Sequence, residues 1–578
     1  MVDLTKKPFN LSPEDIAWVD ETLASLKPSE KINQIFIDMI WNEEPDKLAV
    51  EIKQHNYGGY RYNNQKPLAI YEQNKVIQSG KVPALIAANV EMGGDGAMSG
   101  GTRIGDGIAV AATQDPKNAY YLGYYGCKEA AAVGCNWTFA PVADVDLNWR
   151  NCIISNRAFG SDSNVVLDMS LEYFRGASDA GVACCVKHFP GDGCDERDQH
   201  LATTVNDLSC EEWDDTFGKI YKGLIDAGMQ SIMIGHIMQP EYSRALRPGI
   251  KDEEIMPATL APEILQDLLR EKLEFNGMII TDATHMLGLT SKKKRCDFLP
   301  EMIMSGCDMI LYYRDRDEDI NYMKDALRSK KLTMKRLNEA VRTVLGFKAM
   351  LGLHKKQKQN KLMPPKSAMK VIGCPEHKAK EREILDKSIT LVKNTRNQLP
   401  LTPETHKNIV IYSVESGGIS KLLHKQKSIA QKLEAALKAE GFNPTIFKIN
   451  PLKYMTPKGL NGKKALNDIN IKHFTETYDA AMLIMNVTDF STSNGRSLRW
   501  KIPMGPEIPW YVGEVPTVAI SVAHPFHLLD IPMVPTYINT YNASDQALKQ
   551  TVEKIMGKSE FKGVSPVDAF CGMWDTKL

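Results

Sequence analysis

Six short apolar runs alternate with amphipathic segments between about residues 80 and 315. The runs are VPALIAANV (82–90), WTFAPVADV (137–145), GVACCVKHF (181–189), QSIMIGH (230–236), GMIITD (277–282) and DMILYY (308–313). Strands that are apolar throughout and separated by helical segments indicate a parallel sheet covered on both faces. A spacing of about 40–50 residues per unit favours a (β/α) barrel with insertions over a short open sheet. We therefore predict a TIM-like (β/α) barrel.

A second alternation of apolar runs predicts a second domain. Residues 335–355 have the pattern of a helix that closes the barrel, and a basic, proline-containing stretch follows it. The later runs are SITLVKN (388–394), NIVIYSV (408–414), AAMLIMNV (480–487), TVAISVA (517–523) and TYINTY (536–541). We predict a catalytic barrel over 1–355, an exposed linker over 356–384 and a smaller open α/β sandwich domain over 385–578.

The composition is that of an ordinary globular protein, with 43% hydrophobic and 25% charged residues among 578. The 71 basic and 71 acidic side chains balance, so no general attraction to nucleic acid or to anionic lipid is expected. The N-terminal segment lacks an apolar core, and no stretch is apolar enough to span a bilayer. The eleven cysteines lack CxxC spacing and are interpreted as reduced. We expect a cytoplasmic protein that needs no cofactor and acts on a small uncharged molecule.

Polar side chains collect where the apolar runs end. They are Glu91, Asp144, Asp146, Lys187, His188, His236, Asp282 and Arg314. In a (β/α) barrel the active site lies at the carboxyl ends of the strands, because the loops there converge above the packed core. Helix caps and turn hydrogen bonds could account for any one of these residues, but they explain the whole set poorly. The sequence therefore predicts a site at this end of the barrel.

The densest group of ionisable residues is the segment KHFPGDGCDERDQH (187–200). Its proline and glycines exclude a helix and predict a loop at the mouth of the barrel. Asp198 lies two residues before His200, so its carboxylate can accept the ring N–H and leave the other nitrogen free to move a proton. A solvated charged loop would explain the same spacing. Asp282 ends the run GMIITD, where a rigidly held carboxylate suits a nucleophile but could equally cap the next helix.

Several of these segments resemble glycoside hydrolase family 3, in its β-N-acetylglucosaminidase branch. That branch carries KHFPGHG, four further residues and Asp-Ser-His, whereas this chain has KHFPGDG, four residues and Asp198-Gln199-His200. Other segments that resemble the family, in the family's order, are FAPVADVD (139–146), NRAFGSD (156–162), PATLAPEILQDLLREKLEFNGMIITD (257–282), SGCDMIL (305–311), SITLVKNTRNQLPL (388–401) and VPTYINTYNASDQAL (534–548). The resemblance covers nearly the whole chain.

The resemblance implies a role for each matching residue. Asp282 would be the nucleophile, His200 the acid/base and Asp198 its orienting partner. Charge-assisted hydrogen bonds would orient the sugar hydroxyls. The resemblance assigns this binding to Lys187, His188 and Arg157. Glu91, Asp144 and His236 are further predicted substrate-binding residues, and a satisfied histidine at a strand end is the alternative for His236.

Three positions depart from the family's pattern. Asp192 replaces the histidine of Gly-His-Gly, a form more familiar in the glucosidase branch. Glu91, in ANVEMGG, is the nearest candidate for the family's acidic sugar ligand. Ala283 stands where a second aspartate commonly follows the nucleophile, so the support of the nucleophile must differ there.

These assignments predict a retaining exo-β-N-acetylhexosaminidase, most simply a β-N-acetylglucosaminidase, that acts through a covalent glycosyl-enzyme. One alternative is a β-glucosidase or β-xylosidase of the same family, whose acid, such as Asp489 or Glu507, comes from the second domain. Another is a β-N-acetylglucosaminide phosphorylase, because a histidine acid/base presents no fixed negative charge to an incoming phosphate. A sugar-binding protein without catalysis is a third. We expect a small oligosaccharide or glycoside as substrate and no metal site, and homo-oligomerisation is left open.

Overall fold

The computed structural model describes residues 2–41, 43–416, 427–448, 470–488, 495, 497–501 and 505–578. The chain forms two compact units. The first comprises Met1–Gly107 and Pro116–Glu381, and the second comprises Ile108–Asp115 and Arg382–Leu578. Asp489, a candidate acid of the alternative glucosidase, lies outside the described residues.

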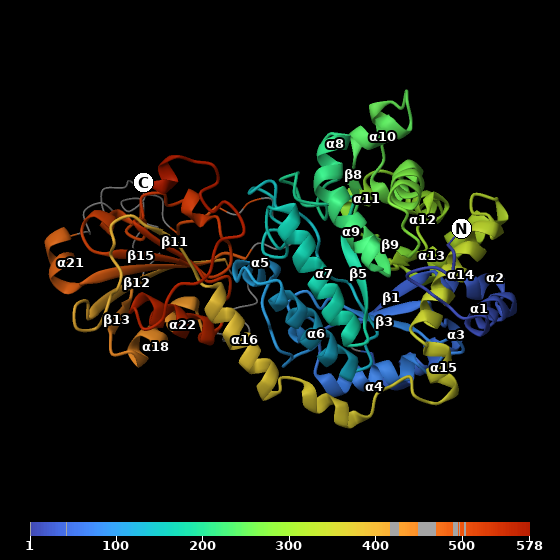
Figure 1. Ribbon diagram of the computed structural model, residues 1–578, viewed down its shortest axis with the longest axis horizontal. Coiled ribbons are helices and arrows are strands. Elements are labelled where there is room, and N and C mark those ends of the chain that lie inside the picture. Colours follow the sequence, from blue (N-terminus) through green and yellow to red (C-terminus); the bar gives the residue numbers. More distant parts are fainter. Residues whose placement is uncertain are drawn as a thin grey trace, which may run out of the picture. The chain divides into compact units, whose positions relative to one another are not determined.

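In the described chain the first unit contains a closed barrel of eight parallel strands (Figure 1). Around the barrel the order is β1-β10-β9-β7-β5-β4-β3-β2. The strands are β1 (Phe36–Ile40), β2 (Gly59–Tyr62), β3 (Leu85–Ala88), β4 (Trp137–Thr138), β5 (Ala183–Phe189), β7 (Ser231–Ile234), β9 (Met278–Ala283) and β10 (Met309–Leu311). The predicted TIM-like barrel is confirmed, although β1 and β2 precede the first predicted run.

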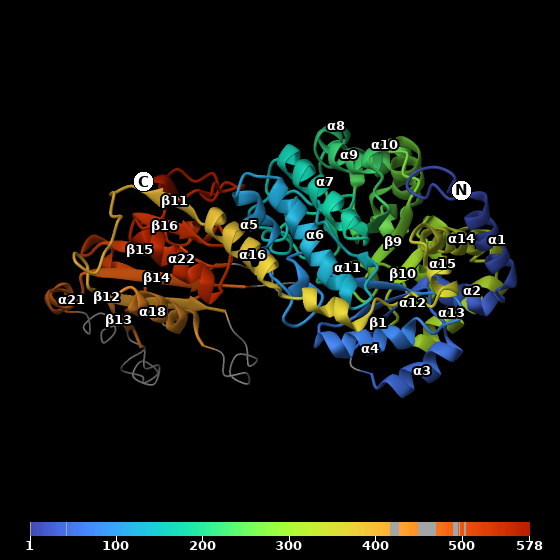
Figure 2. The same cartoon turned by 60° about the horizontal axis from the view of Figure 1, so that its bottom comes forward.

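Helices surround the barrel strands (Figures 1 and 2). The α-helices that lie in or reach the first unit are α1 (Pro13–Ser25), α2 (Pro28–Gln34), α3 (Pro45–Gln54), α4 (Pro67–Ile77), α5 (Gly107–Ala112), α6 (Lys117–Ala132), α7 (Ser163–Asp179), α8 (Cys210–Trp213), α9 (Lys219–Ala227), α10 (Pro240–Leu246), α11 (Leu287–Thr290), α12 (Arg295–Ser305), α13 (Arg316–Arg328), α14 (Met334–Met350), α15 (Leu353–Lys358) and α16 (Pro375–Ser388). Asp214–Gly218 and Glu263–Lys272 are π-helical. Two short strands, β6 (Thr204–Val205) and β8 (Ile237–Met238), pair in parallel outside the barrel.

The segment predicted as one closing helix, 335–355, belongs to two. Gly352 has a φ of 66° between α14 and α15. This left-handed conformation suits glycine and interrupts the helix. The following residues, 356–384, contain a 3₁₀ turn at Lys366–Val371 and most of α16.

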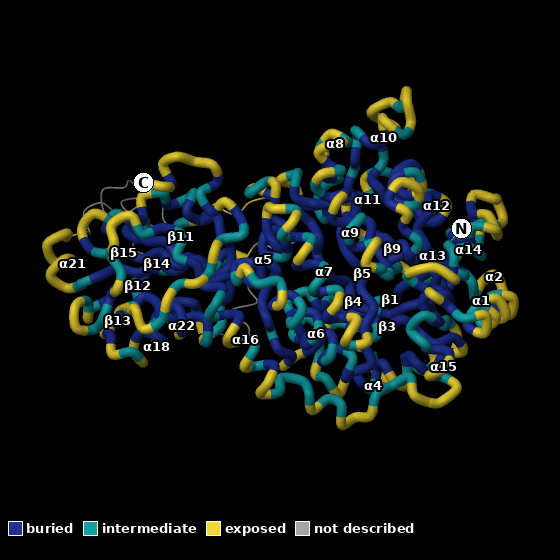
Figure 3. Tube along the Cα trace, in the orientation of Figure 1, coloured by how far each residue is buried: buried dark blue, intermediate teal, exposed yellow. Residues whose placement is uncertain are grey.

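The barrel strands are buried, whereas the exposed parts of the first unit lie in its outer helices and loops (Figure 3). All seven residues of β5 are buried, including Lys187 and His188. Ionisable groups are rarely fully buried without partners. The carboxyl end of β5 therefore marks a place where such partners must be found.

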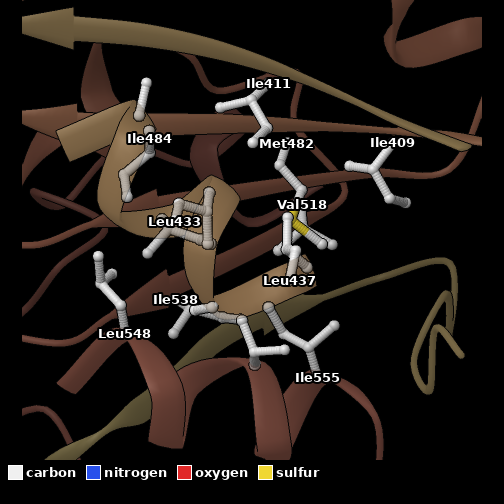
Figure 4. Close-up of a cluster of buried hydrophobic side chains, with 14 of the residues drawn as sticks. Ile409, Ile411, Leu433, Leu437, Met482, Ile484, Val518, Ile538, Leu548 and Ile555 are labelled. Atoms are coloured by element: carbon white, nitrogen blue, oxygen red, sulfur yellow. The ribbon is translucent and has the colours of Figure 1, made fainter. Parts of the chain in front are cut away.

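The second unit contains a six-stranded sheet in the order β11-β16-β15-β14-β12-β13. Its strands are β11 (Thr390–Asn394), β12 (Asn408–Glu415), β13 (Asn443–Ile446), β14 (Ala480–Asn486), β15 (Thr517–Ser521) and β16 (Thr536–Asn539). Only β11, among the described strands, runs antiparallel to its neighbour. Helices α18 (Ile429–Ala439) and α22 (Asp545–Ile555) pack on one face, where Leu433, Leu437 and Ile555 meet strand residues such as Ile411 and Val518 (Figure 4). Helix α21 (Ile471–Thr477) contributes to the core of the other face.

None of the described helices combines the length and the apolar character needed to cross a bilayer.

Candidate active site

Asp282, the predicted nucleophile, lies at the carboxyl end of β9. Its side chain is 13% exposed, and its Oδ1 accepts the backbone N–H of Ala283 at 2.7 Å. Desolvation alone would raise the pKa of Asp282, but its interactions with His188, His236 and His200 and the hydrogen bond from the Ala283 N–H outweigh desolvation and hold that pKa below its usual value. A carboxylate that stays ionised in a nearly dry site suits nucleophilic attack.

The loop that follows β5 turns at two glycines. Gly191 and Gly193 have φ angles of 123° and 119°, in a region that side chains other than glycine rarely adopt. A Cβ at Gly193 would also lie 1.9 Å from the carbonyl oxygen of Val145. Glycine at positions 191 and 193 of the motif is therefore required by backbone geometry.

Asp198 and His200 form the predicted dyad on this loop. Asp198 is fully buried, and its Oδ1 accepts both the backbone N–H and the ring Nδ1–H of His200, at 2.8 and 2.7 Å. Desolvation lowers the pKa of His200, but the Asp198 hydrogen bond and the negative charge of Asp282 outweigh it, so the pKa is raised. With Nδ1 held and the ring 35% exposed, Nε2 remains to give or take a proton.

Glu91 is the centre of a largely buried ion-pair cluster, in which the side chains of Glu91 and Arg157 are 12% and 21% exposed. Its carboxylate accepts the guanidinium of Arg157 at two positions, 2.8 and 3.0 Å, and the ammonium of Lys187 at 2.5 Å. Desolvation opposes the charge on Glu91, but the two cations dominate and hold its pKa well below the usual range. The structure thereby places Glu91, whose register the sequence left open, beside two of the predicted sugar-binding residues.

His188 is held by Asp144 on the adjacent wall of the barrel. Asp144 Oδ2 lies 2.7 Å from His188 Nδ1, and Asp144 Oδ1 accepts the backbone N–H groups of His188 and Asp192. The carboxylate therefore takes the Nδ1–H and directs Nε2 toward Asp282, whose Oδ2 lies 4.0 Å away. Asp192 is itself buried, and both burial and the neighbouring Asp144 raise the pKa of its carboxyl.

His236 is fully buried behind the nucleophile. Its Nδ1 lies 3.1 Å from the hydroxyl of Thr259 and its Nε2 3.0 Å from the carbonyl oxygen of Ala283. Desolvation lowers the pKa of His236, which favours the neutral ring whose Nε2–H donates to that carbonyl. Both backbone polar groups of Ala283 are therefore engaged, its N–H by Asp282 and its carbonyl oxygen by His236. This backbone support is present at the position where the family commonly has a second aspartate.

The structure brings the predicted residues of β3, β5, β7 and β9 to the carboxyl ends of these strands in one barrel. Arg314, by contrast, is exposed next to the start of α13, where its backbone N–H donates to Asp319.

Sequence reasoning missed Gln199, which is 1% exposed and whose amide oxygen accepts the backbone N–H of His236 at 2.9 Å. Its position inside the dyad motif was the only signal that could have drawn attention to it.

Residues 29–347 match the model of the glycosyl hydrolase family 3 N-terminal domain, which is more than half of the chain. The chain belongs to glycoside hydrolase family 3. A β-N-acetylglucosaminidase/β-glucosidase from Cellulomonas fimi is 40% identical over 580 residues, which cover 100% of both chains. A solved structure titled β-glucoside phosphorylase BglX is 38% identical, with a TM-score of 0.91 and 99% of each chain covered. The family 3 β-N-acetylglucosaminidase from Paenibacillus sp. str. FPU-7 is 21% identical with a TM-score of 0.76, over 94% of this chain and 99% of that one, and this likeness shows the fold alone.

The candidate acid Glu507 of the alternative glucosidase belongs to the second unit. It is 5% exposed, and its carboxylate accepts the backbone N–H of Lys501. The family's glycosidase chemistry therefore has a complete candidate set of ionisable groups within the first unit.

Proposed function

We propose that the protein is a retaining exo-glycosidase that releases a non-reducing-end β-N-acetylglucosaminyl residue and also accepts β-glucosides. The observation that carries this proposal is the pairing of an ionised, nearly dry Asp282 with a histidine acid/base, His200, whose pKa is raised by a buried aspartate. The name of the C. fimi relative, which combines both activities, supports both substrates.

In the proposed first step, a carboxylate oxygen of Asp282 attacks the anomeric carbon as the bond to the leaving oxygen breaks. The protonated His200 gives its Nε2 proton to that oxygen, so the aglycone leaves as a neutral alcohol. In the second step the neutral His200 takes a proton from water, which attacks the anomeric carbon and releases Asp282. Two inversions leave the sugar in its original β configuration.

The remaining predicted residues divide into two groups in this proposal. Arg157, Lys187 and Glu91 present charged groups that can bind sugar hydroxyls. Asp144 and His236 are fully buried with their polar atoms bonded inside the protein. We therefore assign them a positioning role, behind His188 and Asp282 respectively.

Parallel assays test the substrate and the stereochemistry. We expect hydrolysis of nitrophenyl β-N-acetylglucosaminide and, more slowly, of the β-glucoside, with the β-anomer as the first product in an NMR time course. An α-anomer as first product would refute the retaining mechanism. Activity on the glucoside alone would refute the assignment of the acetamido sugar.

Phosphorolysis is a second candidate that one observation favours. The acid/base is a histidine, which is neutral after it gives up its proton and so does not repel an approaching phosphate dianion as a carboxylate would. The 38% identical relative titled as a β-glucoside phosphorylase supports the same acceptor here. A sugar 1-phosphate formed in phosphate buffer would establish this route, and free sugar as the sole product at saturating phosphate would exclude it.

The cytoplasmic location stays a prediction from the sequence, and the sequence makes no prediction of the oligomeric state. Cell fractionation tests the first, and a sedimentation measurement tests the second.

A further inference from the structure

Gln199 lies between the two dyad residues, and both ends of its amide are bonded. Its Nε2 donates to Oδ2 of Asp192 at 3.2 Å, and its Oε1 accepts the backbone N–H of His236 at 2.9 Å. The side chain is thus anchored both to the start of its own loop and to the end of β7. A buried amide with both groups satisfied has one low-energy orientation, because any rotation would leave polar atoms unpaired.

The backbone around Gln199 is joined to the segment that follows the nucleophile strand. The carbonyl oxygens of Gln199 and His200 accept the N–H groups of Gly288 and Leu287, each at 3.1 Å. The hydroxyl of Thr203 donates to the carbonyl oxygen of Gly288 at 2.8 Å. A Cβ at Gly288 would lie 2.7 Å from the backbone carbonyl oxygen of Gln199. The close approach of these two segments therefore depends on glycine at position 288.

Asp192, which accepts the hydrogen bond from the Gln199 amide, is itself held by further hydrogen bonds. It is 2% exposed, and its Oδ1 accepts the side-chain amide of Asn151 at 2.8 Å and the N–H of Gly193 at 2.7 Å. Asp192 and Gln199 are also the two positions at which KHFPGDG and Asp-Gln-His differ from the motif that the chain resembles. The structure shows that these two substituted side chains bond to each other.

We propose that Gln199, with Asp192, is a positioning residue that fixes the backbone from which His200 extends toward the substrate. Asp198 then orients the imidazole ring of His200, while Gln199 fixes the position of the backbone at residues 199–200. This inference rests on the proposed role of His200 as the acid/base. It predicts that the loop is held in its working position by the Asp192 carboxyl, which follows β5, and by the His236 backbone N–H, which follows β7, rather than by the bound substrate.

The leaving group of the substrate provides the test. A 2,4-dinitrophenolate leaves without protonation, whereas a phenyl or alkyl aglycone needs the proton of His200. We expect Gln199→Met to lower kcat/KM for a phenyl glycoside by about tenfold or more and to leave that for the dinitrophenyl glycoside nearly unchanged. Equal losses on both substrates, or no loss on either, would overturn the proposal.

Gln78 offers a matched control. It is 6% exposed in the same unit, and its amide, like that of Gln199, makes two hydrogen bonds. Both are to backbone: the amide N–H donates to the carbonyl oxygen of Ala84, and the amide oxygen accepts the N–H of Ala84, each at 3.1 Å. Gln78→Met should lower the melting temperature as much as Gln199→Met without changing the ratio of the two kcat/KM values. A change in that ratio for Gln78→Met would show that the effect is a general loss of stability.

His200→Ala separates this inference from the proposed function. If the loss of kcat/KM in His200→Ala is the same for the phenyl and the dinitrophenyl glycoside, the acid/base assignment itself fails. If the loss of kcat/KM depends on the leaving group in His200→Ala but not in Gln199→Met, only the positioning role of Gln199 fails. The pairing with Asp192 is tested by Asp192→His, Gln199→Ser and the double variant. We expect the double variant to be more active than the product of the two single effects, and strict multiplication of those effects would contradict the pairing.

Discussion

Replacing Lys348 with methionine should stabilise the protein at neutral pH. Lys348 lies on α14 with 0% exposure, and its ammonium donates to Oε1 of Gln34 at 2.7 Å. Desolvation lowers the pKa of Lys348 from 10.5 to about 7. At about 1.4 kcal/mol per pH unit, this fall corresponds to a stability penalty of about 5 kcal/mol when the unfolded chain is protonated.

The sign of the pH dependence follows from the lowered pKa. Between about pH 7 and pH 10.5 the unfolded chain binds a proton that the native chain does not, so stability rises with pH across this window. The penalty is fully present below about pH 7 and absent above pH 10.5. Lys348→Met removes it but leaves the Gln34 oxygen without its donor, at a cost of about 1–3 kcal/mol.

The expected net gain is therefore about 2–4 kcal/mol at pH 7, and it should vanish or reverse near pH 10. Urea unfolding followed by tryptophan fluorescence, at several pH values between 7 and 10, measures the difference between the two proteins. As a control, Lys554 is also buried, but its ammonium pairs with Asp386 at 2.9 Å. Lys554→Met should destabilise at every pH. The reasoning about Lys348 is refuted if its variant loses the same stability at pH 7 and at pH 10.

Three further predictions concern the candidate site. Asp282→Asn should lower kcat by at least about a thousandfold with the fold intact by circular dichroism, and retention of a tenth of the activity would exclude Asp282 as nucleophile. Asp198→Asn removes the group that raises the pKa of His200, so the alkaline limb of the kcat/KM profile should move to lower pH, and an unmoved limb would exclude His200 as the titrating acid. Glu91→Gln leaves Arg157 and Lys187 without their buried carboxylate, and we expect about 3–5 kcal/mol lower stability together with a raised KM. An unchanged melting temperature for Glu91→Gln would show that the two cations do not depend on Glu91.

The barrel could be predicted from the sequence where its strands are uniformly apolar. The runs that become β5, β7 and β9 are mostly apolar, because nearly all of their residues are buried within the barrel. Strands β1 and β2 were not predicted, because their sequences FIDMI and GYRY are short and contain the charged residues Asp38 and Arg61. The run 137–145 was predicted as a strand, but only Trp137 and Thr138 pair as β4, and a proline at 141 cannot donate to a ladder.

The candidate site divides in the same way. Asp198, His200 and Asp282 could be named because their spacing lies within one motif or at one strand end. The partners of Glu91 could not be found, since Arg157 and Lys187 come from separate loops and strands that only the closed barrel brings together. In the sequence, Gln199 is one more polar residue in a charged loop. Its proposed role could not be predicted, because it depends on the backbone N–H of His236, which is 37 residues away.

Every ionisable group of the candidate site comes from the first unit, and the acid/base loop is bonded to the segment that follows the nucleophile strand. The two halves of the proposed reaction are therefore inherited together, as parts of a single folding unit. Sequence changes in the second unit should therefore leave the pH dependence of catalysis unchanged.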